Sequence, residues 1–265
     1  MRRLVLALLF FTPGLFLLQC HDSQLDDEFE GILRVTMFDE PADYDSVFVE
    51  IASVEAHRQS GEQDSGWITL SEDTLLADLL MLIDGEEQVL GEASVEPGVI
   101  RQLRITMGEN NRLVIGEDSY DLDVIGVGHS EVILEINAEI EEGRLYELFL
   151  DFDVSQSIVS RGDEEGYDLE PEIRVIRPET SGDITGDVQP AEHSSQVFAA
   201  AGDDTIRTFT SDAGTFMLRG LTDGNWTVIA KSNSEDYTDG VLEDVGVELG
   251  ETTEIDTLSL QPVEE

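Results

Sequence analysis

The residues best placed to do chemistry are three aspartates in the segment 118–126. Asp121 and Asp123 begin a D-x-D-x-x-G pattern, and Asp118 lies three residues before it. In a calcium-binding loop, hard carboxylate oxygens at alternate positions converge on one cation. The glutamate expected at the twelfth position is missing, because Glu131 falls one residue short. Asp118, Asp121 and Asp123 are therefore calcium candidates, with a solvated acidic turn as the alternative, and no other cofactor is expected.

The sequence contains no recognisable set of catalytic residues. Its four histidines, His21, His57, His129 and His193, are scattered and form no H-E-x-x-H pair. There is no G-x-S-x-G motif, no P-loop, and no S-x-x-K motif at the single lysine, Lys231. Carboxylate pairs for glycoside cleavage stay open, because 59 Asp and Glu residues can supply them anywhere. These features favour a protein without catalytic activity.

The two tryptophans are candidates for contacting a sugar, because an aromatic ring packs against the apolar face of a sugar ring. Burial in a hydrophobic core is the favoured interpretation for both Trp67 and Trp226. Trp67 follows Gly66 and precedes the strand-like stretch 68–70. Trp67 is kept as the ligand-binding candidate.

The chain is strongly acidic. Its 265 residues include 14 Lys and Arg against 59 Asp and Glu, which gives a net charge of −45. Such a charge excludes nucleic acid as a partner, because phosphates are repelled. Nine basic and 41 acidic residues lie in 21–182, and three basic and 18 acidic residues lie in 183–265. The charge is thus spread over the whole surface, which resembles that of proteins from salt-loving organisms, with cation scavenging as the alternative.

The N-terminal residues 1–19 have the composition of a signal peptide. Two arginines precede the apolar run 4–18, which is shorter than the roughly 20 residues that a spanning helix needs. The segment Leu17-Leu18-Gln19-Cys20 resembles a bacterial lipobox, with Gln19 in place of the usual small residue. That resemblance implies lipidation of Cys20, the only cysteine, after cleavage before it. An ordinary secretion signal is the alternative.

A polar, acidic stretch over residues 20–30 predicts a flexible tether behind the lipid. The chain is therefore expected to be attached to a membrane through a lipid anchor and to lie outside the cytoplasm, in the bacterial cell envelope. Several acyl chains give stable attachment, because each buried CH₂ contributes about 0.8 kcal/mol.

Hydrophobic residues alternate with polar ones through most of the chain from residue 31. This period of two predicts half-buried strands of antiparallel sheets over 46–54, 99–107, 131–140 and 144–153. Turn residues rich in Gly, Pro and Asp separate these strands, as in a β-sandwich or barrel. The stretch 74–83 is the exception, because its leucines recur at helical spacing and predict a helix, with a buried strand pair as the alternative.

The order of these segments resembles a bacterial family known as domain of unknown function 4382. The resemblance covers 31–177 and departs from the family at Val99-Ile100, where an aromatic residue usually follows the glycine. It implies an extracytoplasmic β-rich domain, often found on lipoproteins, and brings no known activity. The residues that carry it are Asp39–Asp45, Val47–Ile51, Val54–Arg58, Gly66–Leu70, Asp78–Leu80, Pro97-Gly98, Gln102–Ile105, Leu150–Asp153, Ser157–Val159 and Glu170–Val175.

A second resemblance begins after the linker 178–182. Residues 183–265 are similar to the carboxypeptidase regulatory-like, transthyretin-like module, in which glycine turns lead strands and an internal aromatic residue packs inside. The resemblance implies a module without catalytic activity and places Trp226 at the internal aromatic position. The length of about 80 residues suits a seven-stranded β-sandwich. The residues that carry it are Thr210–Leu218, Gly220-Leu221 and Gly224–Val228.

These observations predict an all-β protein with two consecutive antiparallel β-sandwich-type domains after a signal peptide. The domains expected are a signal peptide over 1–19, a tether over 20–30, a first β domain over 31–177, a linker over 178–182 and a second sandwich over 183–265. The function expected is binding or adhesion, with carbohydrate as the ligand class by fold analogy. A structural spacer that presents or binds an envelope protein is the alternative, and a regulator associated with a hydrolase is a third.

Overall fold

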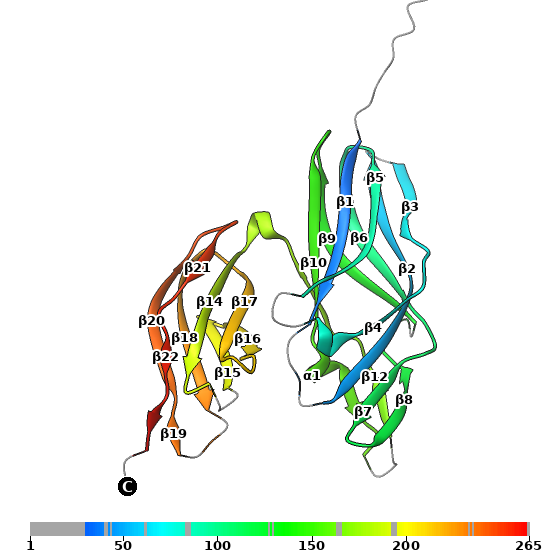
Figure 1. Ribbon diagram of the computed structural model, residues 1–265. Helices are drawn as coiled ribbons and strands as arrows, with labels where there is room; N and C mark the ends of the chain where they lie inside the picture. Colours follow the sequence, from blue (N-terminus) through cyan, green and yellow to red (C-terminus); the bar gives the residue numbers. More distant parts are fainter. Residues whose placement is uncertain are drawn as a thin grey trace, which may run out of the picture.

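The chain folds into two β-rich lobes, shown side by side in Figure 1. The computed structural model describes residues 30–39, 42, 44–60, 63–82, 86–126, 128, 130–162, 166–191, 195–232, 234 and 236–263. The first lobe contains strands β1 to β13, and the second contains β14 to β23. The predicted all-β class is confirmed. The predicted signal peptide, Cys20, and the histidines at 21, 129 and 193 lie outside the described residues.

The first lobe consists of two sheets that face each other. The small sheet has the order β13 (Ile173–Ile176), β10 (Leu145–Phe152), β1 (Gly31–Phe38), β5 (Gln88–Val95). The large sheet has the order β11 (Ile158–Ser160), β12 (Tyr167–Leu169), β8 (Asp118–Val124), β7 (Arg112–Ile115), β2 (Ser46–Ser60), β6 (Gly98–Met107), β9 (Glu131–Ile140). Strands β3 (Gln63–Ser71) and β4 (Leu75–Asp78) also pair with β2.

Alternation of side chains explains the core of this lobe. Leu33, Val35 and Met37 on β1 and Leu103 and Ile105 on β6 point inward and are buried in a single hydrophobic cluster. Most neighbouring strands are antiparallel, while β1 runs parallel to β10 and β12 parallel to β8. Because successive residues of a strand point to opposite faces, the residues between these apolar ones lie on the outer faces of the sandwich.

The second lobe has its own hydrophobic cluster between two further sheets. One sheet contains β17 (Thr215–Leu221), β14 (Gly182–Gln189), β21 (Thr252–Glu254) and β22 (Leu258–Ser259). The other has the order β16 (Asp204–Phe209), β15 (Ser195–Ala201), β18 (Gly224–Ser232), β20 (Gly240–Val247). Strands β19 (Tyr237–Thr238) and β23 (Gln261–Pro262) pair separately. The two lobes are joined by the short 3₁₀ turn η2 (Pro178–Thr180).

The helix predicted over 74–83 is wrong. Strand β4 (Leu75–Asp78) pairs antiparallel with β2, and the 3₁₀ turn η1 (Leu79–Met81) follows it. Leu79 is buried in the first core, whereas Leu76 is 52% exposed. The leucines therefore alternate as in a strand and then turn inward once. Tertiary pairing with β2 outweighs their helical spacing.

The only assigned α-helix in the described part of the chain is α1 (Val154–Ser157), a single turn after β10. The carboxylate of Asp153 accepts a hydrogen bond from the Gln156 N–H at 3.1 Å, which caps the first turn. In the part of the chain that the structure describes, no helix is long and apolar enough to cross a membrane.

Candidate functional site

A row of four side chains crosses the outer face of the large sheet. Strand register aligns Trp67 on β3 with His57 on β2, His57 with Gln102 on β6, and Gln102 with Glu135 on β9. Three strand spacings of about 4.8 Å make this row roughly 14 Å long. Gln102 Nε2 donates to Glu135 Oε1 at 2.6 Å, and the rings of His57 and Trp67 are 5.1 Å apart. We call these four residues the Trp67 row.

A second pair of residues holds the tryptophan ring of the Trp67 row. The guanidinium carbon of Arg104 lies 4.0 Å from the centroid of the Trp67 ring, a cation–π contact. Glu55 fixes this guanidinium, with its Oε2 2.8 Å from Arg104 Nη2 and 2.9 Å from Nε. Both side chains are about one-fifth exposed. The ring therefore packs against a guanidinium that is itself paired with a carboxylate.

This arrangement corrects the expectation that Trp67 is a core residue. Trp67 is partly exposed and belongs to neither hydrophobic cluster of the described residues. Trp226, by contrast, is 2% exposed in the second core, and its Nε1–H donates to the Thr222 carbonyl at 2.9 Å. The prediction of burial is confirmed for Trp226 and wrong for Trp67, because Trp67 falls on the outer face in the register of β3 with β2.

The three calcium candidates lie on β8, which is a regular strand. Asp118, Asp121 and Asp123 are all exposed. Asp121 and Asp123 share the outer face, while Asp123 accepts a hydrogen bond from Arg161 Nη2 at 2.8 Å. Among the described residues, no group of three or more His, Cys, Asp or Glu side chains is placed to hold a metal ion. An extended strand separates these carboxylates instead of wrapping them around one cation.

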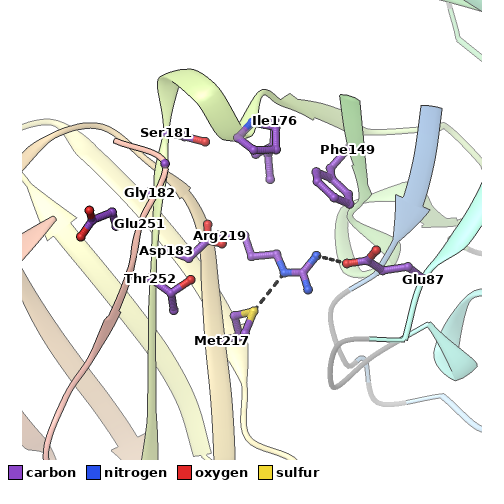
Figure 2. Close-up of a pocket in the computed structure, with 12 residues that line it drawn as sticks. Glu87, Phe149, Ile176, Ser181, Gly182, Asp183, Met217, Arg219, Glu251 and Thr252 are labelled. Atoms are coloured by element: carbon purple, nitrogen blue, oxygen red, sulfur yellow. Dashed lines mark hydrogen bonds and ion pairs between the residues drawn. The ribbon is translucent and has the colours of Figure 1, made fainter. Parts of the chain in front are cut away.

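A second candidate site is the junction between the lobes, where the outer face of the small sheet is covered. Phe38 and Phe149 on this face pack edge to face, with centroids 6.4 Å apart. Arg219 on β17 reaches over both rings, with its guanidinium carbon 4.6 Å from the Phe38 centroid and 5.7 Å from that of Phe149. Its Nη1 donates to Glu87 Oε1 at 2.6 Å. Figure 2 marks this interaction with a dashed line.

Next to Arg219 lies a cavity of about 270 Å³ lined by both lobes. The apolar lining includes Phe149, Ile176 and Met217, and the polar lining includes Asp183 and Thr252. Burial raises the pKa of Asp183, although the Gly220 N–H, which donates to its Oδ1 at 3.1 Å, and the nearby Arg219 oppose the shift. The cavity therefore combines apolar walls with a partly desolvated carboxylate.

The most deeply buried ion pair of the junction joins Asp151 and Arg174. Asp151 is 3% exposed, and its Oδ2 accepts hydrogen bonds from Arg174 Nη2 at 2.6 Å and from Nε at 3.1 Å. Burial raises the pKa of Asp151, and Arg174 opposes that shift. Arg174 also donates through Nη1 to the backbone carbonyl of Arg219 at 3.0 Å, which links the pair to the second lobe.

Sequence reasoning missed this junction, although one signal for it was present. At the ends of β1 and β10 the alternation of apolar and polar residues stops, and Thr36, Met37 and Phe38 are all buried, as are residues 150–152. A strand segment that is buried on both faces must be covered by another layer. Here that layer is the second lobe.

Several solved structures are distantly similar to this chain. The Bacillus anthracis TIE protein is 11% identical, with 89% of this chain and 34% of that chain covered and a TM-score of 0.25. The chain thus spans about a third of that protein. The shaft pilin SpaA from Lactobacillus rhamnosus GG is 8% identical, with 89% and 99% covered and a TM-score of 0.28. The minor pilin GBS52 of Streptococcus agalactiae is 8% identical, with 88% and 98% covered and a TM-score of 0.25. Similarity at this level carries no argument about function.

No curated protein matches the chain. The resemblance of 183–265 to the carboxypeptidase regulatory-like module stays a prediction. The resemblance of the first domain is confirmed by a family match over residues 30–171, more than half of the chain. The chain therefore belongs to the family described as Domain of unknown function (DUF4382).

Proposed function

We propose that the chain is a non-catalytic binding or adhesion protein of the bacterial cell envelope and that its ligand is a carbohydrate. The observation that carries this proposal is the Trp67 row on the outer face of the large sheet. A partly exposed indole ring lies there in register with an imidazole, an amide and a carboxylate. Carbohydrates are bound by such combinations, because the ring packs on C–H groups while planar polar groups bond the hydroxyls.

The electrostatics of the Trp67 row favour a neutral glycan. Glu135 lies on this face, Glu55 is paired with Arg104, and the net charge of the whole chain is −45. A uronic acid or a phosphorylated sugar meets long-range repulsion when it approaches such a surface. The roughly 14 Å length of the row matches an oligosaccharide of a few rings rather than a single sugar.

The test is a glycan panel probed at high salt with residues 21–265, which we call the mature chain. High salt screens the repulsion among carboxylates that would otherwise unfold the protein. The variant W67A removes the ring and is expected to reduce binding at least about tenfold, the effect of losing a contact worth roughly 1.4 kcal/mol. The matched control is F48A. Like Trp67, Phe48 is an aromatic residue on the outer face of the large sheet that packs against an arginine, and the Arg112 guanidinium carbon lies 4.6 Å from the centroid of its ring. Absence of binding to any glycan by folded protein would contradict the proposal.

Attachment to the membrane through Cys20 is part of the same proposal. The lipobox-like segment 17–20 supports it, together with the absence of any other cysteine. In the native host the full chain is expected to incorporate a labelled fatty acid and to fractionate with membranes, and C20S is expected to do neither. Release of the wild-type chain without label would leave an ordinary secretion signal as the explanation.

A second candidate function is a structural spacer that presents or binds an envelope protein. The junction favours it, because the contacts of Arg174 and Arg219 connect the lobes directly. In this case no glycan binds, and cross-linking of the mature chain in intact cells captures one protein partner. A saturable glycan signal that W67A removes decides against the spacer.

A further inference from the structure

We infer that the junction between the lobes is a salt-dependent lock: the lobes dock at high ionic strength and swing apart about the η2 linker at low ionic strength. The inference goes beyond the proposed function and does not depend on it. It rests on how the few basic residues of the second lobe are used, on the burial of the docked face, and on the charge of the two lobes.

Both arginines of the second lobe contact carboxylates of the first lobe. Residues 183–265 contain only Arg207, Arg219 and Lys231 as basic residues, against 18 acidic ones. Arg219 Nη1 lies 2.6 Å from Glu87 Oε1, and Arg207 Nη2 lies 2.6 Å from Asp153 Oδ2. Arg207 Nη2 is also 3.2 Å from the Ser155 hydroxyl. The second lobe thus has its two arginines on the face that meets the first lobe.

These contacts are partly shielded from solvent. The side chain of Arg219 is 15% exposed and lies over the rings of Phe38 and Phe149, and that of Arg207 is 31% exposed. Phe38 and Ile176, which the second lobe covers, are 7% and 4% exposed. Docking therefore combines apolar burial with short ion pairs. Both contributions persist when salt is added, because salt does not screen apolar contacts and screens partly buried ion pairs only weakly.

Separation is driven by repulsion between two acidic bodies. Residues 21–182, which include the first lobe, hold nine basic and 41 acidic residues, and residues 183–265 hold three and 18. The range of this repulsion is set by the screening length, which falls from about 10 Å at 0.1 M salt to about 3 Å at 1 M, so most of the repulsion is lost as salt is added. Added salt therefore weakens the repulsion more than the attraction, which is the reverse of the usual effect of salt on an ion-paired interface.

The geometry provides one pivot for the movement. In the part of the chain that the structure describes, the two lobes are connected once, through η2. Around it, the Ser181 hydroxyl donates to the Arg177 carbonyl at 2.8 Å, and the Gly250 N–H donates to the Ser181 carbonyl at 2.7 Å. Rotation about this linker separates Arg207 and Arg219 from their carboxylates without breaking any strand pairing, because no sheet of the described residues contains strands of both lobes.

Small-angle X-ray scattering of the mature chain from 0.05 to 3 M NaCl tests the inference, with circular dichroism confirming intact strands at each point. The radius of gyration is expected to be smallest at high salt and to rise as salt is removed. The pair-distance distribution should gain a second maximum as the lobes separate. A radius that is constant while the strands stay folded would overturn the inference.

Charge variants at high salt test the docking of the lobes even if the wild-type chain unfolds at low salt. At 3 M NaCl, R219E is expected to give the open distribution, and E87R/R219E is expected to restore the closed one. The control R112Q/R161Q removes two arginines of the first lobe that lie outside the junction contacts and should stay closed. The inference fails if R219E remains closed or if the exchange of both charges does not restore docking.

Discussion

Asp151 is a carboxylate that the fold buries beside a single guanidinium. Its Oδ2 takes both hydrogen bonds from Arg174, and its Oδ1 is buried with no hydrogen-bond partner among the described residues. Removing one partner of such a pair costs more than the pair contributes, because an uncompensated charge remains. Arg174 is 35% exposed and keeps contact with water. Loss of its partner is therefore less costly for Arg174 than for the buried Asp151.

This asymmetry predicts opposite outcomes for the two partners of the pair. R174L leaves the Asp151 carboxylate buried without its cation, and we expect it to lower the free energy of unfolding by about 3 kcal/mol. D151N keeps the shape without the charge, and we expect a change within about 1 kcal/mol. Urea denaturation at pH 7 and constant salt measures both, and equal losses for the two variants would contradict this account.

The raised pKa values of Asp151 and Asp183 predict how stability depends on pH. Burial raises both above the values of the unfolded chain, so the native state binds protons more tightly. The free energy of unfolding should therefore increase as the pH falls from 7 toward the ordinary carboxylate pKa near about 4. D151N should flatten this dependence, whereas D121N, at an exposed position of β8, should retain it. Thermal melts at several pH values measure the slopes.

At the scale of elements, the bend of β17 at Gly220 couples the second lobe to the first. Gly220 has φ +76°, and a Cβ there would lie 2.8 Å from Ile176 Cγ1 and 3.1 Å from Arg174 Nη1. Both neighbours belong to β13 of the first lobe. The glycine is therefore required by its own backbone and by close approach across the junction.

Two glycine substitutions separate these requirements. Gly116 has φ +60°, and the Cβ added in G116A would have no other atom within 4 Å. We therefore expect only the backbone strain of an alanine at positive φ, about 1 kcal/mol. G220A adds overpacking against Ile176, which costs roughly 1 to 3 kcal/mol more. Urea denaturation compares the two, and a loss in G220A no larger than that in G116A would show that the lobes do not pack closely at this point.

Much of the element structure follows from the sequence, because local alternation is enough to identify a half-buried strand. The segments over 99–107 and 131–140 coincide with β6 and β9 to within a residue at each end. The stretch 74–83 was harder, since its leucines fit a helix and a strand alike until β2 is present as a partner. The junction needed tertiary information, because nothing local tells which layer covers Phe38 and Phe149.

The candidate site was predictable only in part, for a related reason. Trp67 was identified as an aromatic residue that can contact a sugar, but its face depends on the register between β3 and β2, which has irregularities on both sides of the His57–Trp67 pairing. A slip of one residue reverses the face of every side chain in a strand. The partners His57, Gln102 and Glu135 come from strands far apart in sequence, so no motif could have grouped them.

At the scale of the whole molecule, the charge of −45 predicts the response of stability to salt. Screening reduces repulsion among carboxylates, and we expect the melting temperature to rise by several degrees between 0.1 and 2 M NaCl. KCl should act equally, because screening does not depend on the identity of the cation. A melting temperature that falls with salt, or an effect confined to calcium at matched ionic strength, would refute solvent adaptation as the role of these residues.

The most direct test of the account is tryptophan fluorescence during titration of the mature chain with a neutral oligosaccharide that binds in the glycan panel. The two indoles differ in environment, with Trp226 2% exposed in the second core and Trp67 partly exposed on the outer sheet face. We predict a saturable change in emission that persists in W226F and F48A, together with at least about tenfold weaker binding of W67A in the glycan panel. Unchanged binding by W67A, or a panel in which no glycan binds folded protein, would contradict carbohydrate recognition by the Trp67 row.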